Sequence, residues 1–164
     1  MAVTSDQDQS TRRQDDEIFR GIYKQMRRFA AVAAPPEVEP EDLLQEALVE
    51  TLRRHHLVDL DHPAAYLRRV ILSLASNHRR RRGPRWKAER LIAASKGRNA
   101  DSYPSDLSEL MWLSPLQRAV LYLSEVEGYK FEEIGQMVGC SAPAARMSAS
   151  RARRRLRSVL IGEA

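Results

Sequence analysis

The 164-residue sequence holds one cysteine, few aromatic residues (6%) and no long hydrophobic run. The single thiol, Cys140, cannot form an internal disulfide and has no second cysteine beside it for a zinc site. The longest apolar stretches, such as residues 70–72, fall far short of the roughly 20 apolar residues of a membrane-spanning helix. The polar, acidic N-terminus lacks a basic start followed by an apolar core, which excludes a secretory signal. We therefore expect a cytoplasmic protein without a membrane span.

Residues typical of catalysis are equally scarce. The histidines are His55, His56, His62 and His78, and none stands in a spacing that recurs in metal sites. The sequence has neither a glycine-rich phosphate loop nor a nucleophile motif. We therefore expect a protein that is not an enzyme and that needs no metal and no cofactor.

Basic residues, by contrast, are abundant and unevenly placed. The chain has 27 Lys and Arg against 22 Asp and Glu, a net charge of +5. Residues 1–67 carry −5, residues 68–98 carry +10, residues 99–145 carry −5 and residues 146–164 carry +5. Two separate basic blocks indicate two contacts with a polyanion, and the acidic segments indicate a different partner. Two solvated helix faces are the alternative interpretation.

Apolar residues recur at helical spacing in two parts of the chain. In the first part, a polar tail at residues 1–14 precedes helices over about 19–30, from Pro40, and from about Pro63 to Gly83. Residues 84–105 lose the pattern and are interpreted as a linker. Beyond them, helical segments are predicted at 107–112, from Pro115 to about Glu127, at 131–138, and from Ala142 to about Leu160. The sequence thus predicts an all-α protein of two small helical domains, 15–83 and 106–164, joined by a flexible linker.

Residues 131–141 give the most specific local signal, because a short helix, a glycine turn and a capped second helix are what a helix-turn-helix requires. Gly135 is small where the two helices must cross closely. The inward face of the following helix is predicted to hold Ala145, Ala149, Ala152, Leu156 and Val159. The outward face is predicted to hold Arg146, Met147, Ser150 and Arg151, where arginine can bond guanine in the major groove. An ordinary helical hairpin with a basic exposed side is the alternative.

The motifs of both parts resemble the extracytoplasmic-function sigma factors of bacterial RNA polymerase. Leu113-Ser-Pro-Leu-Gln-Arg-Ala-Val-Leu, Gly139-Cys-Ser and Ser150-Arg-Ala-Arg resemble the family's domain four. Glu41-Asp-Leu-Leu-Gln-Glu-Ala resembles the family's Asp-Leu-x-Gln-Glu helix, and His62-Pro-Ala-Ala-Tyr-Leu through Asn77-His-Arg-Arg resembles its promoter-melting helix. The likeness covers roughly residues 17–83 and 106–160, in the family's order.

The resemblance implies roles for residues of the first part. It implies that Asp42, Gln45 and Glu46 dock on the coiled coil of the largest subunit of core RNA polymerase. It further implies that Asn77 captures a base extruded at the upstream edge of the minus-ten element, with the loop Asp59–His62 lining the same pocket. The remaining minus-ten candidates are an aromatic residue that can stack on a base and a run of arginines that can hold phosphates, namely Tyr66, Arg79, Arg80, Arg81 and Arg82.

The resemblance also assigns the second part to the minus-thirty-five element and the flap of the polymerase. The implied base readers are Arg146, Met147, Ser150 and Arg151, and the phosphate candidates are Arg118, Lys130 and Arg153. Ala144 and Ala145 replace a usual Thr and branched aliphatic, and Pro143 replaces a usual glycine, so the family's promoter sequence cannot be transferred. An anti-sigma factor is a further implied partner. A stand-alone helix-turn-helix regulator that binds operators as a dimer is the rival function, but it leaves the acidic helix at 41–53 and the block 77–82 without a role.

Overall fold

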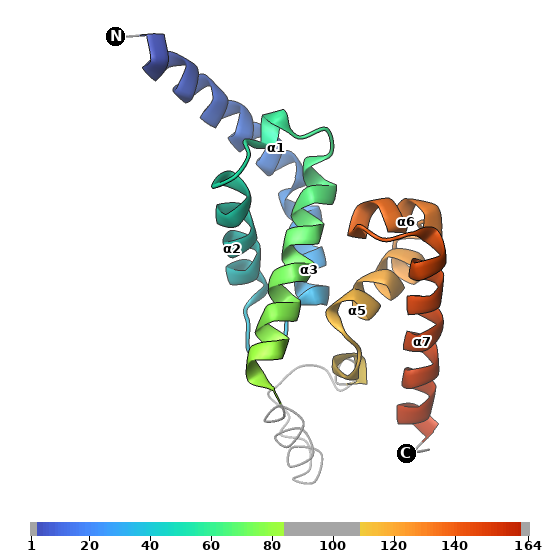
Figure 1. Ribbon diagram of the computed structural model, residues 1–164. Coiled ribbons are helices and arrows are strands. Elements are labelled where there is room, and N and C mark those ends of the chain that lie inside the picture. The colour runs from blue at the N-terminus through green and yellow to red at the C-terminus, as the bar shows by residue number, and fades with distance from the viewer. Residues whose placement is uncertain (1–2, 84–108, 162–164) are drawn as a thin grey trace.

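The computed structural model describes residues 3–83 and 109–161 (Figure 1). The elements of the first half are α1 (Val3–Ala33), α2 (Pro40–Leu52), the 3-10 turn η1 (Leu57–Asp59) and α3 (Pro63–Arg82). The elements of the second half are the 3-10 turn η3 (Glu109–Trp112), α5 (Pro115–Leu121), the π-helical turn η4 (Tyr122–Val126), α6 (Phe131–Val138) and α7 (Ala142–Ile161). All regular structure in these two ranges is helical, which confirms the all-α prediction. The predicted linker, 84–105, lies outside the described residues.

Helix ends follow the local chemistry of the sequence. Pro40 and Pro63 occupy the first turns of α2 and α3, where a missing N–H costs nothing. Ser114 caps α5, because its side chain accepts from the Gln117 N–H at 3.2 Å while the Gln117 side chain accepts from the Ser114 N–H at 3.0 Å. Gly139 ends α6 with a φ of 79°, a left-handed conformation that glycine adopts without strain.

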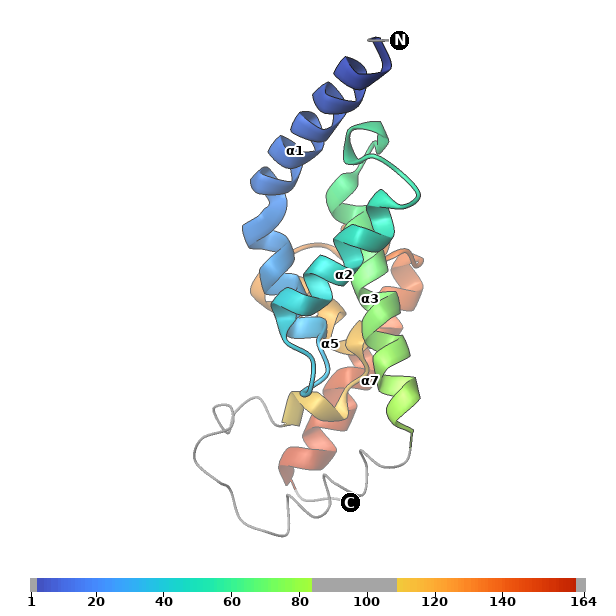
Figure 2. The ribbon, with the colours of Figure 1, turned by 90° about the vertical axis from the view of Figure 1, so that its left-hand side faces the viewer.

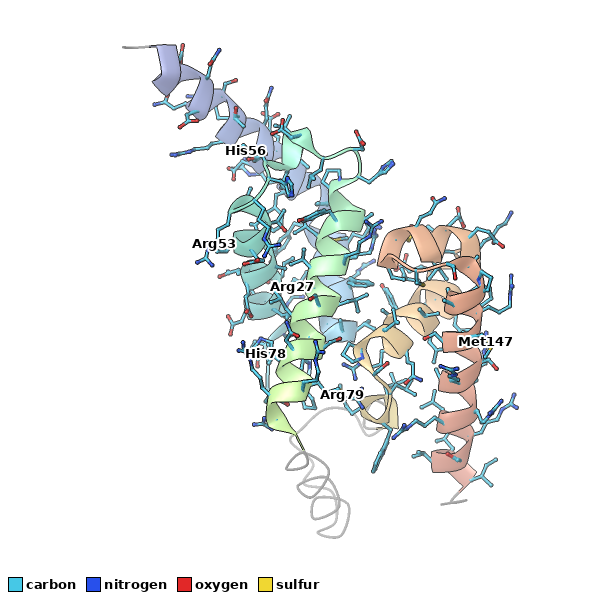
Figure 3. All side chains as sticks on the ribbon, in the orientation of Figure 1. Arg27, Arg53, His56, His78, Arg79 and Met147 are labelled. Atoms are coloured by element: carbon cyan, nitrogen blue, oxygen red, sulfur yellow. The ribbon has the colours of Figure 1, made fainter. Side chains whose placement is uncertain are left out.

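The N-terminal part of α1 differs from the sequence prediction. A disordered tail was expected over residues 1–14, whereas α1 begins at Val3 and continues without a break to Ala33. Most described side chains before Asp15 are exposed, so this part of the helix extends the amphipathic segment beyond the bundle. In Figure 3, His56 lies beside this extension. No helix in the described ranges is long and apolar enough to cross a bilayer.

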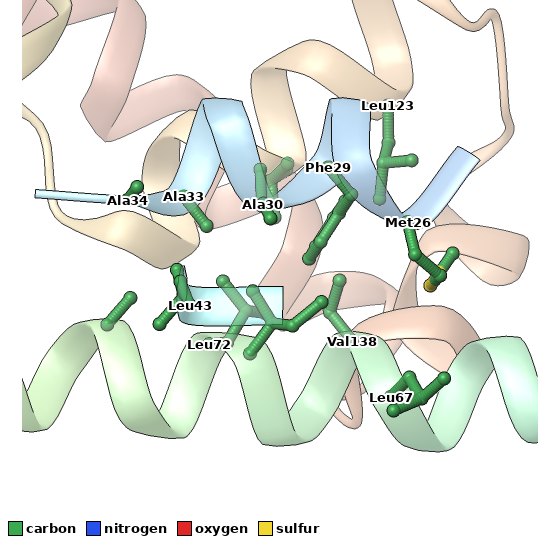
Figure 4. Close-up of a cluster of buried hydrophobic side chains, with 14 of the residues drawn as sticks. Met26, Phe29, Ala30, Ala33, Ala34, Leu43, Leu67, Leu72, Leu123 and Val138 are labelled. Atoms are coloured by element: carbon green, nitrogen blue, oxygen red, sulfur yellow. The ribbon is translucent and has the colours of Figure 1, made fainter. Parts of the chain in front are cut away.

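The two halves are packed together around one continuous core. α1 contacts α2 and α3 in its own half and α5 in the other half, while α3 also contacts α6. Phe29 of α1 (1% exposed) and Leu72 of α3 share this core with Leu123 of η4 and Val138 of α6 (Figure 4). The sequence predicted two bundles on a tether; in the structure the two bundles form a closed body. Each half is too small to bury its apolar surface efficiently alone, so joining the halves removes further apolar area from water.

Candidate polymerase and nucleic-acid interface

The acidic face of α2 is open to a partner. Asp42, Gln45 and Glu46 are exposed, while Leu43, Leu44 and Ala47 on the opposite face are fully buried. Helix α2 packs on α1 and α3, and Figures 1 and 2 both show it on the side of the first half that faces away from α5–α7. The closed arrangement of the two halves therefore leaves this face uncovered.

One docking candidate is linked to α3. Glu46 Oε2 lies 3.0 Å from His78 Nε2, across the α2–α3 contact. His78 and Arg79 are neighbours in sequence, but they face opposite partners (Figure 3). Burial, followed by the charge of Arg155 in α7, lowers the pKa of Arg79. The first half thus has an acidic face on α2 and a basic end of α3 that reaches toward the second half.

The C-terminal end of α3 gathers the basic block. Arg80, Arg81 and Arg82 are exposed, Asn77 is half-buried, and Asn77 Oδ1 accepts a hydrogen bond of 2.6 Å from Arg80 Nη2. Arg82 Nε lies 3.1 Å from Glu37 Oε1. The amide of Asn77 is therefore held in place by its own helix, with exposed guanidinium groups around it.

Tyr66 and the loop that precedes α3 lie at the other end of this helix. The Tyr66 ring meets the His55 ring edge-on, with 5.4 Å between ring centroids. Asp59, Asp61 and His62 are exposed on the same loop. From His62 to Asn77 the chain climbs α3 by about 22 Å, at roughly 1.5 Å per residue. The expectation that the loop and Asn77 line one pocket is therefore wrong, because four turns of helix separate them.

A stripe along α3 connects these two ends. Tyr66, Ser73 and Asn77 recur at intervals of seven and four residues, which places them on one face of a helix. Arg69 borders this stripe, and its Nη2 donates a 2.8 Å hydrogen bond to the main-chain oxygen of Gln136 in α6. A Cβ on Gly139 would lie 3.1 Å from Arg69 Cδ, so the arginine stem packs closely on the turn. The helix-turn-helix of the second half thus lies against the edge of the α3 stripe.

The helix-turn-helix itself has the predicted geometry. A Cβ on Gly135 would lie 2.5 Å from the main-chain oxygen of Cys140, so only glycine permits this close crossing. Ala145, Ala149 and Ala152 are fully buried, while Leu156 and Val159 are partly buried. Arg146, Met147, Ser150 and Arg151 are exposed, with Met147 at 53%. The predicted inward and outward faces of α7 are confirmed.

Ion pairs and ring contacts hold part of the outward face. The Arg146 guanidinium lies over the Phe131 ring, 5.5 Å from its centroid, and 3.7 Å from a carboxylate oxygen of Glu132. Arg153 forms an ion pair with Glu125. Lys130, at the start of α6, is exposed. Contacts with α6 and η4 therefore direct the side chains of Arg146 and Arg153.

Arg118 does not lie with the other phosphate candidates. Its side chain is buried, and the residue is 5% exposed. Its guanidinium donates to the main-chain oxygens of Val32 (2.7 Å), Ala33 (2.7 Å) and Ala34 (3.2 Å) in the first half, and to that of Leu113 (2.9 Å) in its own half. The expectation that Arg118 contacts a DNA phosphate does not fit this arrangement, because the cation caps the C-terminal end of α1, where the helix dipole is negative.

A second buried arginine was not identified from the sequence. Arg68 of α3 is 4% exposed and lies 5.7 Å from the centroid of the Phe29 ring, and its Nε has no hydrogen-bond partner. Burial lowers the pKa of Arg68, against the raising effects of Tyr129, Glu127 and Tyr122. In the sequence Arg68 directly precedes the exposed Arg69, and no local pattern predicts that the second half covers its side chain.

The histidines, acids and thiol of the described residues do not gather into a metal site. Among them, no group of three His, Cys, Asp or Glu side chains is placed to hold a metal ion. Burial raises the pKa of the lone thiol, Cys140, which disfavours the reactive thiolate.

Comparisons with known proteins decide the family. The family described as "Sigma-70, region 4" matches residues 109–156, which span η3 through α7. The chain is 30% identical to the RNA polymerase sigma-E factor of Streptomyces coelicolor over 158 residues, which cover 89% of this chain and 85% of that relative. This chain belongs to the extracytoplasmic-function sigma factors of bacterial RNA polymerase. The similarity runs through both halves, so it accounts for the acidic helix and the α3 block, and a stand-alone regulator is not favoured.

Other similar proteins agree with this membership. The sigma factor is 30% identical to the RNA polymerase sigma factor CarQ of Myxococcus xanthus, over 86% of this chain and 82% of that protein. Its fold is similar to that of RpoE from Bartonella quintana, solved in complex with the anti-sigma factor NepR, with a TM-score of 0.58, 22% identity, and coverage of 88% of this chain and 95% of that chain. The family acts in transcription initiation and is not enzymatic, so this sigma factor directs RNA polymerase to promoters.

Proposed function

We propose that the sigma factor binds core polymerase through the exposed face formed by Asp42, Gln45 and Glu46 of α2. Three polar side chains within five residues lie on one helical face, opposite a buried apolar face that fixes the helix. The acidic charge of this face suits a basic surface such as a polymerase coiled coil. The second half supplies a separate contact with the flap.

We further propose that α3 handles the melted minus-ten strand. Arg79–Arg82 hold phosphates at the duplex edge, and Asn77 offers both a donor and an acceptor to an unpaired base. Tyr66, about three turns before Asn77 on the same helix, and the adjoining loop Asp59–His62 form a second contact, where the half-buried ring can stack on a base. The alignment of Tyr66, Ser73 and Asn77 on one stripe supports a strand that runs along the helix.

The outward face of α7 is proposed to read the minus-thirty-five element as closed duplex. Arg146, Met147, Ser150 and Arg151 are exposed on the second helix of the helix-turn-helix, which is the element that enters the major groove. Lys130 and Arg153 flank this face and suit phosphate contacts. Met147 offers an apolar contact of the kind that a thymine methyl accepts.

The closed arrangement of the two halves has a direct consequence for this function. By their numbering, the minus-ten and minus-thirty-five elements lie about 25 base pairs apart, which is on the order of 80 Å at roughly 3.4 Å per base pair. Helices α3 and α7 are each about 30 Å long and belong to one closed body, in which both contact α5 and α6 (Figures 1 and 2). Reading both elements at once therefore requires the halves to separate, and we propose that core polymerase binding drives this opening.

An anti-sigma factor is the partner proposed to oppose the opening. The structurally similar RpoE was solved with its anti-sigma factor NepR, and a protein that binds both halves of this chain together would keep the α3 stripe and the α7 face from spanning a promoter. The polymerase face of α2 stays exposed in the closed form, so such a partner must cover it as well to block core binding.

The observation that carries the proposal is the exposure of two separate nucleic-acid surfaces, on α3 and α7, together with an acidic docking face on α2. Run-off transcription on genomic fragments tests it, with core polymerase alone and with the purified chain added. Transcripts that begin at defined sites only when the chain is present support the function. Absence of both transcripts and a complex on gel filtration contradicts it.

A further inference from the structure

Asp15 of α1 is an acid on the apolar face of a helix. It precedes the core-contacting Ile18, Phe19 and Ile22 by one to two turns, and it is 7% exposed. A carboxylate is rarely buried to this degree unless hydrogen bonds compensate the lost hydration. Its neighbour Asp16 is exposed and pairs with Arg20 on the surface. Specific hydrogen bonds must therefore compensate the lost hydration of the Asp15 carboxylate.

The loop between α2 and α3, residues 53–62, supplies the hydrogen-bond partners of Asp15. Asp15 Oδ1 accepts a 3.0 Å hydrogen bond from the main-chain N–H of Val58, and Asp15 Oδ2 lies 2.8 Å from His56 Nδ1. Both partners are more than 40 residues away in sequence and belong to the 3-10 turn η1 or to its N-cap. Both oxygens of the Asp15 carboxylate thus bind the turn η1 or the residue before it.

The rest of the loop is held by main-chain hydrogen bonds within the turn and by the partly buried Leu60, which packs against the core. Leu57 is the one side chain of residues 53–62 that is buried, at 1% exposure, and Val58, Asp59, Asp61 and His62 are exposed. The loop nevertheless leads directly into α3, and its His55 ring packs edge-on against Tyr66. The position of the loop against α1 therefore depends on the apolar contacts of Leu57 and Leu60 and on the hydrogen bonds of Asp15, and the loop in turn contacts Tyr66 through His55.

We propose that Asp15 is a positioning residue for the minus-ten strand: it fixes the loop 53–62 so that Tyr66 and Asp59–His62 meet an unpaired base in one preset geometry. The inference rests on the proposed role of that loop and of Tyr66. A loop ordered before binding loses less conformational entropy on binding, and a fixed pocket discriminates among bases better than a mobile one. Asp15 itself touches no DNA; it acts through Val58 and His56.

The test uses holoenzyme assembled from core polymerase and each full-length variant, on a promoter mapped by run-off transcription with the unchanged chain. Asp15→Ala removes both contacts, whereas Asp15→Asn keeps an oxygen for the Val58 N–H and an amide for His56. Asp16→Ala is the matched control, since it removes the neighbouring acid from the exposed side of the same helix. Each holoenzyme is compared on the mapped promoter and on versions with single changes in the minus-ten element.

Asp15→Ala is expected to lower open-complex formation on the mapped promoter by about tenfold, as for the loss of one to two hydrogen bonds. It is also expected to reduce the ratio of open-complex formation on the mapped promoter to that on promoters with a changed minus-ten element. Asp15→Asn is expected to restore most of that ratio, and Asp16→Ala to leave it intact. Core affinity and binding to minus-thirty-five duplex are expected to be the same in all three variants, which a general loss of structure would not permit.

Two outcomes overturn the proposal. Unchanged promoter discrimination in Asp15→Ala, while Tyr66→Ala and Asn77→Ala still impair melting, removes the positioning role and leaves the proposed function standing. If Asp15→Ala and Asp15→Asn both lose core-polymerase affinity and promoter opening to the same extent, Asp15 stabilises the fold and does not position the minus-ten strand. Failure of the unchanged chain to start transcription at any promoter counts against the proposed function instead.

Discussion

Arg69 Nη2 in the first half donates a 2.8 Å hydrogen bond to the main-chain oxygen of Gln136 in the helix-turn-helix. Arg69 borders the stripe of α3 proposed to meet the melted strand, so a side chain at the edge of one nucleic-acid surface is used to hold the other half in place. The closed form therefore competes with DNA for α3. Because of this competition, the stability of the interface between the halves should affect transcription initiation. The two buried arginines, Arg118 and Arg68, are expected to affect that stability in opposite directions.

Arg118→Ala is expected to open the protein. The change removes hydrogen bonds to four main-chain oxygens, three of them at the C-terminal end of α1. Losing charged hydrogen bonds in a buried site should weaken the closed form by about 2–4 kcal/mol. Small-angle X-ray scattering should record a larger radius of gyration, with Arg151→Ala, which changes an exposed arginine, as the control. A radius unchanged from that of the parent would show that Arg118 does not hold the halves together.

Arg68→Met is expected to have the opposite effect. Arg68 is a buried cation whose Nε has no hydrogen-bond partner, and a methionine of similar length can pack on Phe29 without that cost. Replacing a poorly compensated buried charge by an apolar side chain should stabilise the closed form by about 1–2 kcal/mol. Urea unfolding measures the gain, and transcription at limiting core polymerase should fall because opening is harder. Lower stability in the variant would mean that the guanidinium is well compensated by its remaining contacts.

Glu46→Lys is expected to weaken binding to core polymerase without disturbing the fold. Glu46 is exposed on α2, and its contact with His78 lies near the surface, so the free energy of unfolding should change by no more than about 0.5 kcal/mol. Fluorescence anisotropy with labelled core polymerase measures the affinity, and circular dichroism follows the melting. Glu132→Lys, an exposed acid in the other half, is the charge-matched control for this measurement. Equal affinity in the parent and Glu46→Lys would remove this residue from the docking face.

The elements of this sigma factor are predictable from sequence because their signals are local. Pro40, Pro63, Ser114 and Gly139 mark helix ends through interactions with residues at most four positions away. The contacts that join the halves carry no such signal: Arg118 binds oxygens 84 to 86 residues distant. In sequence it looks like any other arginine on a helix that is expected to bind DNA. Asp15 gave a weak signal that was missed, an acid at helical spacing from Ile18, Phe19 and Ile22.

The two nucleic-acid surfaces are expected to fail at different steps of initiation. Asn77→Ala should reduce strand opening and leave closed-duplex binding intact, because its proposed target is an unpaired base. Arg146→Ala and Arg151→Ala should lose initial binding, by about 1–3 kcal/mol for each good bidentate contact. Permanganate footprinting beside a binding assay separates the steps, and pre-melted template should rescue Asn77→Ala alone. Arg146→Ala that binds normally but does not melt the promoter would mean that the two roles are interchanged.

The anchor between Asp15 and His56 is expected to weaken with rising pH. The hydrogen bond to Asp15 comes first among the causes that raise the pKa of His56, burial opposes it, and the charges of Asp15, Asp59 and Asp8 add to it. Because the folded-state pKa of His56 lies above the unfolded value of about 6.5, the stabilisation is complete below that value and is lost as the pH rises through the folded pKa.

NMR titration of the His56 ring tests this expectation, together with the hydrogen-exchange protection of the Val58 amide, corrected for its intrinsic exchange rate. The Val58 amide should be better protected at pH 6 than at pH 8. In Asp15→Ala the His56 pKa should fall toward its usual value and the protection should lose its pH dependence, whereas Asp16→Ala should keep both. A His56 pKa that is the same in the parent and in Asp15→Ala would show that the carboxylate does not bind the protonated ring.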